Sequence, residues 1–537
     1  MNTEAQKPHV TLRCARAAVF IFLAIFSGLF IYCVTFRLTY PFELEWIEGE
    51  MVCHGLRLAE WQPIYAAPST SFVAEIYPPV YYLLTALLYR LFDTINFTIP
   101  RIISLLSCLG ILILLYRIAI KEGGDKSIGL LTCGFFLSFY EIHGTWYDLA
   151  RVDMLLFVFL LAGCYVLAYG TRTTFSTIFS ALLLVLACYT KQSGLCFLPC
   201  AALYLFFKDR QQSFIFTGVV SLLLLSVFFI LQYASDGWFG TYVLFNPLGH
   251  KQLVTKPLSE LQFRLLFEMR DKLITEMRYE IFYKLPIFFT MVLAFLVHRL
   301  VALTRSTHFT IWEWTAVGAV VSYFSIRPYP GSERNDFIYL TLWGCILLGL
   351  LLIKLKKAVT DDTRQSTQTV VYLLLALQLC LQLYNPKPLI PNKEDIKKGA
   401  EFIAMVGDLP GEVYIPYHSF YAVMAGKKMI FNGGAYWAYQ ILAKERFKPE
   451  ELMDKIRKQA FSAIIIDGLG YLCAKGEPVP VDNVKLLLTS GDELSQVVAE
   501  HYTIAGKIPY STDNEFRNVA GFRIRPEIIL KPKSSPP

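Results

Sequence analysis

The sequence has few charged residues. Asp, Glu, Lys and Arg make up only 17% of its 537 residues, whereas they make up about a quarter of a typical soluble domain. Hydrophobic residues account for 55% of the chain, and the mean hydropathy is +0.45. This composition excludes an ordinary soluble protein. Repeated apolar runs of about 20 residues, separated by short charged patches, predict an α-helical polytopic membrane protein.

The chain also lacks the patterns of several other protein classes. It has 12 cysteines but no C-x-x-C pair. Most of the cysteines lie inside apolar runs, which favours buried side chains over a metal or redox centre. The sequence contains no internal repeat and no low-complexity tract. The net charge of +7 comes from basic residues in short loops, so it does not indicate binding to nucleic acid.

No small-residue cleavage site follows the first apolar stretch, which is also long for the core of a signal peptide. We therefore expect this stretch to remain as the first of about eleven transmembrane helices. The expected spans cover residues 17–36, 102–120, 127–143, 154–170, 174–190, 194–207, 213–233, 285–303, 309–326, 336–353 and 369–385.

The distribution of lysine and arginine predicts the orientation of these spans. With a cytoplasmic N-terminus, the loops expected on that side are basic or mildly basic, as in residues 116–126 and 354–364. The loops expected outside include the acidic stretch that follows the first span. One orientation therefore fits the whole chain, with an extracytoplasmic C-terminal region.

Residues 77–92 are apolar but short for a span, because Pro78 and Pro79 delay the start of a helix. Counting them as a span would also place the later basic loops outside. We therefore expect a juxtamembrane helix in the outer interface, a depth that suits its tyrosines and Arg90. The first outer loop then covers residues 37–100 and carries two juxtamembrane helices, the first of which holds the acidic stretch.

The composition changes after the last span. Residues 389–537 are expected to form a soluble α/β domain on the outer side, since about 150 residues are enough for an independent core. Residues 411–417 and 461–468 have the pattern of buried strands, and residues 392–407 and 449–460 have the pattern of helices.

Four glutamates lie within eight positions after the first span, at Glu43, Glu45, Glu48 and Glu50. Glu45 and Glu48 are three residues apart, so they share one face of a helix. A solvated amphipathic face explains this pattern without any function. A carboxylate pair at an interface can instead act as a general base or hold a divalent cation. No metal ligands and no cofactor are firmly predicted.

A second acidic stretch lies where the fourth expected span begins. Asp148, Arg151 and Asp153 follow one another closely there. Charged side chains at the end of a membrane helix are costly unless they are paired or face a cavity. A structural salt bridge and a functional site are both consistent with this pattern.

Isolated cations stand at the expected outer ends of other spans, at Arg101, Lys191, Arg327 and Arg334. Each of them alone fits a topological or snorkelling residue. Together they surround the same outer face as the glutamates, and Arg and Lys at that depth suit a phosphate or diphosphate group. Acids and cations at one membrane boundary suggest group transfer from a lipid-linked phosphate donor.

Several motifs in this order resemble the GT-C membrane glycosyltransferases, near the protein O-mannosyltransferase and lipid A aminoarabinose transferase branch and its uncharacterised bacterial members. The likeness covers roughly residues 10–350. The motifs are EWIEG (45–49), WQPIY (61–65), YPPVYY (77–82), PRIISLL (100–106), ARVDML (150–155), TKQSG (190–194) and PGSERNDF (330–337).

The resemblance implies a GT-C-like transmembrane catalytic domain over residues 1–388 in a bacterial inner (plasma) membrane. It implies inverting transfer of a sugar from a polyprenyl-phosphate donor to a hydroxyl of a glycan, lipid or protein acceptor. Glu48 matches the family's acid before glycine, and Glu45 matches the acid three residues earlier. Arg101 matches the phosphate-binding arginine, and Asp153 matches the second-loop acid. The chain departs from the aminoarabinose branch at residues 76–77, where Ile and Tyr replace a lysine.

These comparisons assign candidate residues to three roles. The catalytic candidates are Glu48, Glu45 and Asp153. The candidates for binding the donor phosphate are Arg101, Arg151, Lys191, Arg327 and Arg334. The candidates for binding other parts of the substrates are Tyr77, Tyr81, Tyr82, Asp148 and Asn335.

A transporter or flippase of lipid-linked saccharides is the main alternative, because charges near a bilayer can also line a transport path. Such proteins commonly contain inverted repeats with broken helices near the midplane, and the sequence has no paired half-length segments interrupted by Gly or Pro. A non-catalytic accessory protein and a ligase that uses a diphosphate donor are further alternatives. Release of polyprenyl phosphate from a sugar-loaded donor separates an enzyme from an accessory protein.

Overall fold

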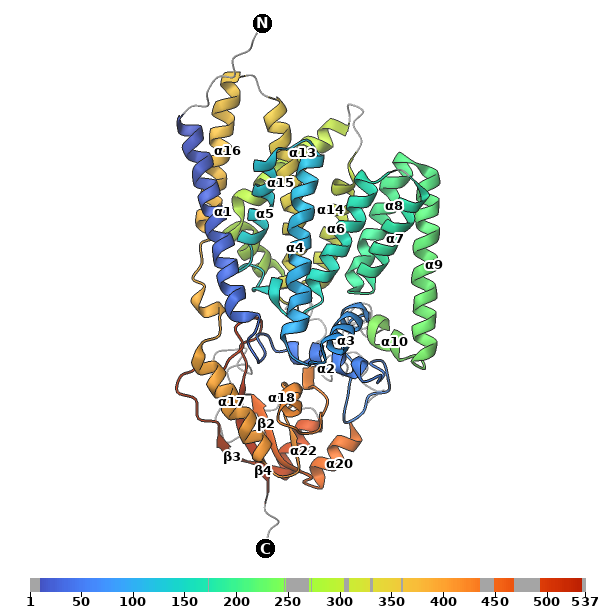
Figure 1. Ribbon diagram of the computed structural model, residues 1–537, viewed down its shortest axis with the longest axis vertical. Coiled ribbons are helices and arrows are strands. Elements are labelled where there is room, and N and C mark those ends of the chain that lie inside the picture. The colour runs from blue at the N-terminus through green and yellow to red at the C-terminus, as the bar shows by residue number, and fades with distance from the viewer. Residues whose placement is uncertain are drawn as a thin grey trace.

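A bundle of long helices makes up most of the molecule, and a smaller part with a β-sheet covers one end of the bundle (Figure 1). The first helix, α1, begins at the end of the bundle away from the sheet (Figure 1). The computed structural model describes residues 10–171, 173–245, 247, 270–271, 273–303, 309–328, 332–358, 361–434, 449–467 and 493–533.

Each of the eleven segments expected to span the membrane carries a helix. These helices are α1 (Val10–Arg37), α4 (Thr98–Lys121), α5 (Lys126–Ser138), α6 (Asp153–Tyr169), α7 (Thr174–Cys188), α8 (Phe197–Lys208), α9 (Arg210–Ala234), α13 (Pro286–Leu303), α14 (Ile311–Ile326), α15 (Ile338–Ala358) and α16 (Asp361–Leu381). The prediction of a predominantly helical membrane protein is confirmed.

The number of spans stays a prediction. Among the described residues, four helices are long and apolar enough to cross a membrane alone, and their bounds are Val10–Arg37, Thr98–Lys121, Arg210–Ala234 and Arg334–Lys357. A fifth candidate is the pair Leu273–Lys284 and Pro286–Ala302, which is bent by 94° at its break. Several other helices are apolar but shorter than 18 residues.

Side-chain caps define where several of these helices begin. The side chains of Asp125, Thr173 and Asp209 accept hydrogen bonds from backbone N–H groups in the first turns of α5, α7 and α9. Thr310 and Glu313 form a reciprocal capping box at the start of α14. Because an N-terminal turn has no intrahelical acceptors for its N–H groups, such caps set the helix start.

Two short helices lie between α1 and α4, at the end of the bundle that faces the sheet (Figure 1). They are α2 (Glu48–Ala59) and α3 (Val80–Phe92). On α3, Tyr81 and Tyr82 are buried, whereas Leu83 and Leu87 on the opposite side are exposed. An exposed apolar face of this kind suits the interfacial position that the sequence predicts.

The part beyond α16 is built on a four-stranded sheet with the order β1-β2-β4-β3. Its strands are β1 (Glu412–Tyr414), β2 (Phe461–Asp467), β3 (Tyr502–Lys507) and β4 (Pro526–Pro532). β1 pairs with β2 in parallel, and the other two pairs are antiparallel. The accompanying helices are α17 (Lys393–Asp408), α18 (Ser419–Met424), α20 (Glu450–Arg457) and α22 (Glu493–His501). The two expected strands and two expected helices coincide with β1, β2, α17 and α20.

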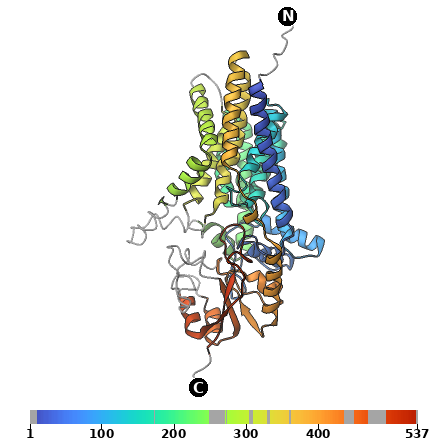
Figure 2. The same ribbon diagram turned by 90° about the vertical axis from the view of Figure 1, so that its left-hand side faces the viewer.

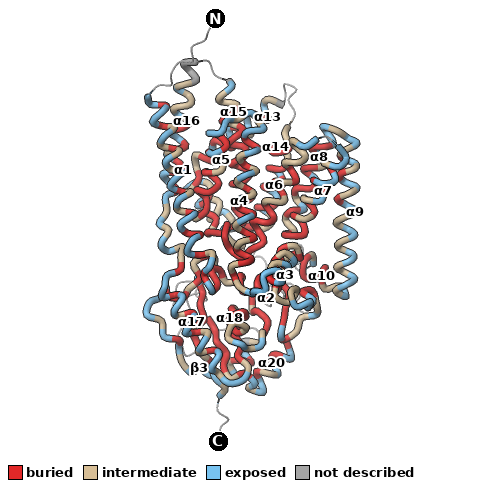
Figure 3. The backbone as a smooth tube through the Cα atoms, in the orientation of Figure 1, coloured by how far each residue is buried: buried red, intermediate tan, exposed pale blue. Residues whose placement is uncertain are grey.

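The sheet also lies at one end of the bundle when the molecule is turned by 90° (Figure 2). Buried residues form a continuous region from the middle of the bundle to the junction with the sheet (Figure 3). In contrast, α9 is largely exposed although it is apolar, with Leu222, Phe229 and Ile230 all more than half exposed. Apolar side chains on the outside of a helical bundle are suited to contact with lipid tails.

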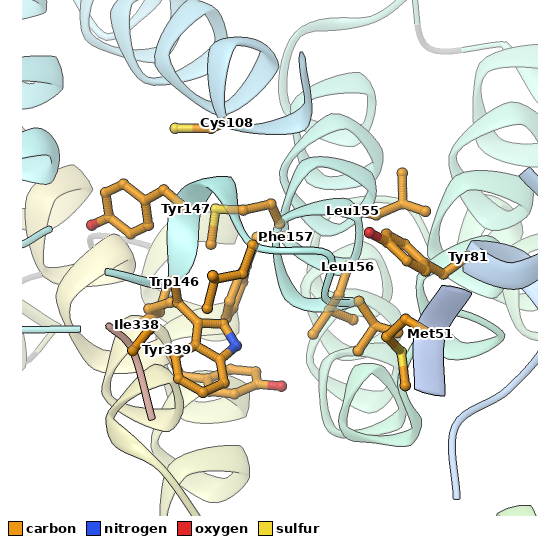
Figure 4. Packing of buried hydrophobic residues seen from close by; sticks show 14 of the residues in the cluster. Met51, Tyr81, Cys108, Trp146, Tyr147, Leu155, Leu156, Phe157, Ile338 and Tyr339 are labelled. Atoms are coloured by element: carbon orange, nitrogen blue, oxygen red, sulfur yellow. The ribbon is translucent and has the colours of Figure 1, made fainter. Parts of the chain in front are cut away.

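A packed apolar layer lies beside the junction (Figure 4). It brings Trp146, Phe157 and Tyr339 together on one side and Met51 and Tyr81 on the other. The rings of Phe157 and Tyr339 meet edge to face, with centroids 4.7 Å apart. Because cores of this kind resist deformation, the layer gives the polar residues near it a rigid support.

Candidate active site

Glu48, the first residue of α2, is completely buried and forms a bidentate ion pair with Arg101 of α4. Its Oε2 lies 2.6 Å from Arg101 Nη2, and its Oε1 lies 3.0 Å from Arg101 Nε. The N–H groups of Leu44 and Ala150 donate to the same carboxylate at 2.7 Å each. Burial alone would raise the pKa of Glu48, but Arg101 and these hydrogen bonds outweigh it and lower the pKa below its usual value.

The remaining N–H groups of Arg101 donate hydrogen bonds to backbone carbonyls. Its Nη1 donates to the carbonyls of Arg37 at 3.1 Å and Tyr40 at 2.5 Å, and its Nη2 donates to that of Phe42 at 2.6 Å. A guanidinium has five N–H donors, so the protein itself uses all of them. Arg101 therefore holds the chain in place where α1 ends and the first outer loop begins.

Glu45 is equally buried but poorly paired. Its Oε2 accepts from Ile47 N at 3.2 Å and from Arg151 Nη1 at 3.3 Å. Its Oε1 is buried and has no hydrogen-bond partner in the described part of the chain. Burial raises the pKa of Glu45 to about 8, although Arg151 opposes the shift. Near neutral pH this carboxyl group can therefore both take up and release a proton.

Arg151 connects Glu45 with the YPPVYY motif. Its Nη2 donates to the hydroxyl of Tyr77 at 3.1 Å, and its guanidinium lies over the ring of Trp146, 5.4 Å from the centroid. Its Nε is buried and lacks a partner among the described residues. A buried donor without an acceptor is costly, so this N–H is well placed to bind an anionic ligand.

Side chains from three other segments contact the carboxylate of Asp153. Lys191 Nζ lies 2.8 Å and Asn335 Nδ2 lies 3.0 Å from its Oδ1, and the indole of Trp146 donates to its Oδ2 at 3.0 Å. Lys191 also approaches Asp336 at 3.7 Å. The start of α6, the turn after α7 and the turn before α15 therefore meet at one point.

The three candidate tyrosines have different surroundings. Tyr77 accepts from Arg151, whereas Tyr81 donates to the carbonyl of Pro100 at 2.8 Å and thereby ties α3 to α4. The hydroxyl of Tyr82 is buried without a partner in the described residues, and its ring stacks on His54 with centroids 4.6 Å apart. Tyr77 and Tyr82 therefore have polar groups available to a ligand, whereas Tyr81 has a structural role.

Other candidates are engaged elsewhere. Asp148 accepts from Arg37 Nε at 2.7 Å and from Tyr140 at 2.9 Å, so both its oxygens are used at the end of α1. Arg327 pairs with Glu276 at 2.8 Å and Glu280 at 2.6 Å. The side chain of Arg334 is 48% exposed and lies 3.8 Å from Glu141. These contacts do not join the cluster of Glu45, Arg151 and Asp153.

Sequence reasoning missed Glu75, which lies two residues before Tyr77. Glu75 is buried, and its N–H donates to His54 Nε2 at 3.0 Å. Burial raises the pKa of Glu75, and the nearby Arg151 opposes the shift. An acid placed directly before the YPPVYY motif was the signal that could have revealed it.

Sequence reasoning also missed the contribution of the C-terminal domain. His418 is completely buried between Glu43 of the first outer loop and Asp467 at the end of β2. Its Nδ1 is hydrogen-bonded to Glu43 Oε2, and its Nε2 lies 3.1 Å from Asp467 Oδ1. The neighbouring Ser419 donates to Glu50 at 2.6 Å. The acidic stretch is therefore held from both sides of Glu45 and Glu48.

The same domain also covers Glu45 directly. Ala520 N donates to the carbonyl of Leu44 at 2.9 Å. Gly521 has a φ of +60°, and a Cβ built there would lie 2.9 Å from Glu45 Cγ. Only glycine adopts this backbone conformation without strain and allows so close an approach. The part of the chain beyond α16 thus lies directly against Glu45.

Within the described residues, no group of three or more His, Cys, Asp and Glu side chains is arranged to hold a metal ion. The cluster instead combines carboxylates with a guanidinium and an ammonium group. Such a set can move a proton and stabilise a phosphate.

Comparisons with known proteins give one family and one fold. Residues 77–234 match the family model described as dolichyl-phosphate-mannose-protein mannosyltransferase. No curated protein sequence matches the chain significantly.

Three solved structures illustrate the fold. AglB, the oligosaccharyltransferase of the archaeon Archaeoglobus fulgidus in complex with an inhibitory peptide and a dolichol-phosphate, aligns over 93% of this chain and 80% of its own, with a TM-score of 0.52 and 11% identity. The oligosaccharyltransferase of that organism tethered with an acceptor peptide aligns over 84% and 69%, with a TM-score of 0.51 and 10% identity. ArnT from Cupriavidus metallidurans bound to undecaprenyl phosphate aligns over 84% and 92%, with a TM-score of 0.48 and 11% identity.

The two oligosaccharyltransferase structures, with TM-scores above 0.5, share the fold of this chain, and at these identities they show the fold alone. Taken together with the family match over residues 77–234, this fold supports a membrane glycosyltransferase of the GT-C superfamily.

Proposed function

We propose that this protein transfers a sugar from a polyprenyl-phosphate donor to an acceptor hydroxyl, with Glu45 as the general base. One observation carries the proposal. Glu45 is a buried carboxylate with an unpaired oxygen, and it contacts Arg151, a buried guanidinium with an unpaired N–H. A base for the acceptor and a donor for the phosphate therefore lie side by side.

The reaction is a single displacement at the anomeric carbon of the sugar. The acceptor oxygen forms a bond to this carbon while its proton passes to Glu45. The bond between the carbon and the phosphate oxygen breaks, and its electron pair leaves with polyprenyl phosphate. Attack from the side opposite the leaving group inverts the anomeric configuration. The positive charges of Arg151 and Lys191 stabilise the charge that grows on the leaving phosphate.

The geometry favours Glu45 over Glu48 as the base. Glu48 already accepts four hydrogen bonds, two of them from Arg101. A carboxylate held in this way is a weak base, because each bond stabilises its charged form. Glu48 and Arg101 act as positioning residues that fix the first outer loop, on which Glu45 stands.

The fold neighbours support a lipid phosphate as part of the donor. The AglB structure contains a dolichol-phosphate, and the matching family model is described by its dolichyl-phosphate-mannose substrate. We extend this chemistry to the present chain as a polyprenyl-phosphate-linked hexose or pentose. We place the site on the extracytoplasmic face of a bacterial inner membrane, where the acidic loop and the C-terminal domain meet.

Release of polyprenyl phosphate tests the proposal. The purified full chain in nanodiscs is mixed with sugar-loaded polyprenyl phosphate lipids extracted from cells that lack this protein, together with surface glycans from the same cells. Liquid chromatography with mass spectrometry follows both lipids. The wild type should release polyprenyl phosphate, and Glu45→Gln should not.

The exposed Glu60 at the end of α2 supplies the matched control. Glu60→Gln should react like the wild type. Movement of the intact donor across the bilayer without cleavage would support a flippase and overturn the transferase. Full turnover by Glu45→Gln would remove Glu45 from the role of base.

A further inference from the structure

One end each of α1, α15 and α16 lies at the end of the bundle farthest from the sheet (Figure 1). Residues of these three helices line a polar cavity. Its volume is about 100 Å³, and it is also lined by residues from the start of α5. None of its lining residues belongs to the candidate active site. Its polar side is formed by Arg16, Asp125, Lys356 and Gln368.

The charges on this polar side do not cancel. Lys356 Nζ pairs with Asp125 Oδ2 at 2.7 Å. No carboxylate in the described chain lies within salt-bridge distance of Arg16, and its Nη2 donates to the neutral Gln368 at 2.6 Å. Its Nε is buried and has no partner among the described residues. Among the described side chains that line the cavity, two cations and one carboxylate therefore leave one positive charge without a counter-ion.

The opposite side of the cavity is apolar. Phe20, one helical turn below Arg16, lines it together with Ile128, Leu352 and Val371. The ring of Tyr372 lies under the Arg16 guanidinium, 5.2 Å from its centre. The site thus combines a cationic rim with an apolar wall, the two surfaces that an amphiphile with an anionic head group needs.

Its position also suits a membrane lipid. Arg16 immediately precedes the apolar span expected over residues 17–36, so its guanidinium lies at the level of the head groups. Basic pockets between membrane helices on the cytoplasmic side, where the sequence predicts the N-terminus, are suited to anionic lipid head groups. A guanidinium also matches the geometry of a phosphate better than an ammonium group does.

We propose that this cavity binds the phosphodiester head group of an anionic phospholipid from the leaflet opposite the C-terminal domain. The monoanionic phosphodiester neutralises the unpaired charge of Arg16, and Arg16 Nε donates to a phosphate oxygen. One acyl chain lies along Phe20 and Val371. This site is independent of sugar transfer.

The test compares the full chain in nanodiscs of phosphatidylcholine with and without phosphatidylglycerol. In the wild type, phosphatidylglycerol should raise the unfolding midpoint by roughly 2–4 °C, and native mass spectrometry should detect retained phosphatidylglycerol after mild delipidation. Arg16→Gln should lose both effects, and Arg16→Lys should keep part of them. The matched control is Arg13→Gln, because Arg13 is exposed on the same helix and does not line the cavity; it should behave like the wild type.

Thr367→Tyr provides a second variant that blocks the rim without removing a charge, which keeps the test decisive if Arg16→Gln does not fold. It should also lose the retained lipid. Equal losses in the Arg13 and Arg16 variants would mean diffuse surface attraction and overturn the site. A full stabilising effect of inorganic phosphate in phosphatidylcholine discs would show that the cavity takes a free anion, and would overturn the lipid assignment.

Discussion

His418 and Glu43 are hydrogen-bond partners although 375 positions separate them in the sequence. His418 Nε2 lies 3.1 Å from Asp467 on its other side, so a single buried imidazole connects the sheet to the first outer loop. Burial favours a neutral ring, but Asp467 and Glu43 outweigh it and raise the pKa of His418 to about 10. The histidine is therefore charged at neutral pH and holds the loop two residues from Glu45.

Loss of His418 should affect the chemical step more than donor binding. His418→Ala leaves Glu43 and Asp467 without their shared cation, so the first outer loop shifts. A displacement of about 1 Å at a reacting group can cost roughly 10²-fold in rate, and we expect a fall of this order in kcat with little change in the donor KM. Steady-state kinetics measures both. His418→Gln should restore part of the rate, and His501→Ala on α22 should have no effect. A change confined to the donor KM would contradict a positioning role.

Stability should fall as the pH rises. The pKa of His418 is raised from 6.5 to about 10, and burial raises the pKa of Glu43 from 4.5 to about 7. In both cases the folded state binds the proton more tightly than the unfolded state. Protonation therefore stabilises the folded state fully at a pH below the pKa of the unfolded state, and this stabilisation is lost as the pH rises through the pKa of the folded state.

Thermal unfolding of the protein in detergent between about pH 5 and pH 10 measures this dependence. The midpoint should fall across the range. His418→Gln should flatten the fall above about pH 7, because this histidine no longer titrates. A wild-type midpoint that rises steadily with pH would contradict the assigned shifts.

The rate of sugar transfer should rise with pH through the pKa of Glu45. A general base acts in its deprotonated form, and the pKa of Glu45 is about 8. We therefore expect kcat/KM for the acceptor to increase with pH and reach half its maximum near this value. Glu45→Gln should lower turnover by about 10²–10⁴-fold, the usual contribution of one base. A profile that is flat between pH 6 and pH 9 would exclude Glu45 as the titrating base.

Replacement of Arg151 should change both donor binding and the pH profile. Arg151→Gln removes the cation that lowers the pKa of Glu45, so the midpoint of the kcat/KM profile should move to higher pH. The donor KM should rise, because a phosphate ligand loses a charged partner. Arg334→Gln, at a half-exposed arginine outside the cluster, is the control. If the pH profile of kcat/KM and the donor KM both stay unchanged, Arg151 affects neither the pKa of Glu45 nor donor binding.

Arg101→Ala should reduce stability. The change removes five hydrogen bonds and leaves the buried Glu48 carboxylate without its counter-charge. Loss of one partner of a buried ion pair typically costs about 3–5 kcal/mol, which chemical or thermal unfolding can measure. Arg117→Ala, at an exposed position on the same helix, should be close to neutral. A stable Arg101→Ala variant with only a raised donor KM would identify Arg101 as a phosphate ligand.

Much of the fold could be predicted because its signals are local. Long apolar runs predicted the helices of the bundle, and the run FSAIIID predicted strand β2, since hydrophobic periodicity depends only on neighbouring residues. The pairing of β2 with β4 had no such signal. Their partners, such as Ile464 and Leu530, are far apart in the sequence, and β-pairing is set by long-range packing.

The candidate site was predicted in part for the same reason. Asp153 and Lys191 were selected because charged side chains at the ends of apolar spans are rare and costly, and Asn335 was selected because it lies in the PGSERNDF motif of the family resemblance. Their convergence required three helix ends to meet. Glu75 was missed although it lies close to the YPPVYY motif, because one acid in a loop is usually solvated.

The sequence by itself determined that this is a helical membrane protein and that acids and cations gather at one end of its spans, because hydropathy and charge are properties of each residue and its neighbours. Only the tertiary structure decided which of two similar glutamates is available. Arg101 donates to a backbone carbonyl at the end of α1, and Glu48 accepts from the N–H of Ala150. Glu45 lies against Gly521, and one of its oxygens has no hydrogen-bond partner among the described residues. The physical reason is that a carboxylate's basicity depends on the partners that folding brings to it, and these come from segments hundreds of residues apart.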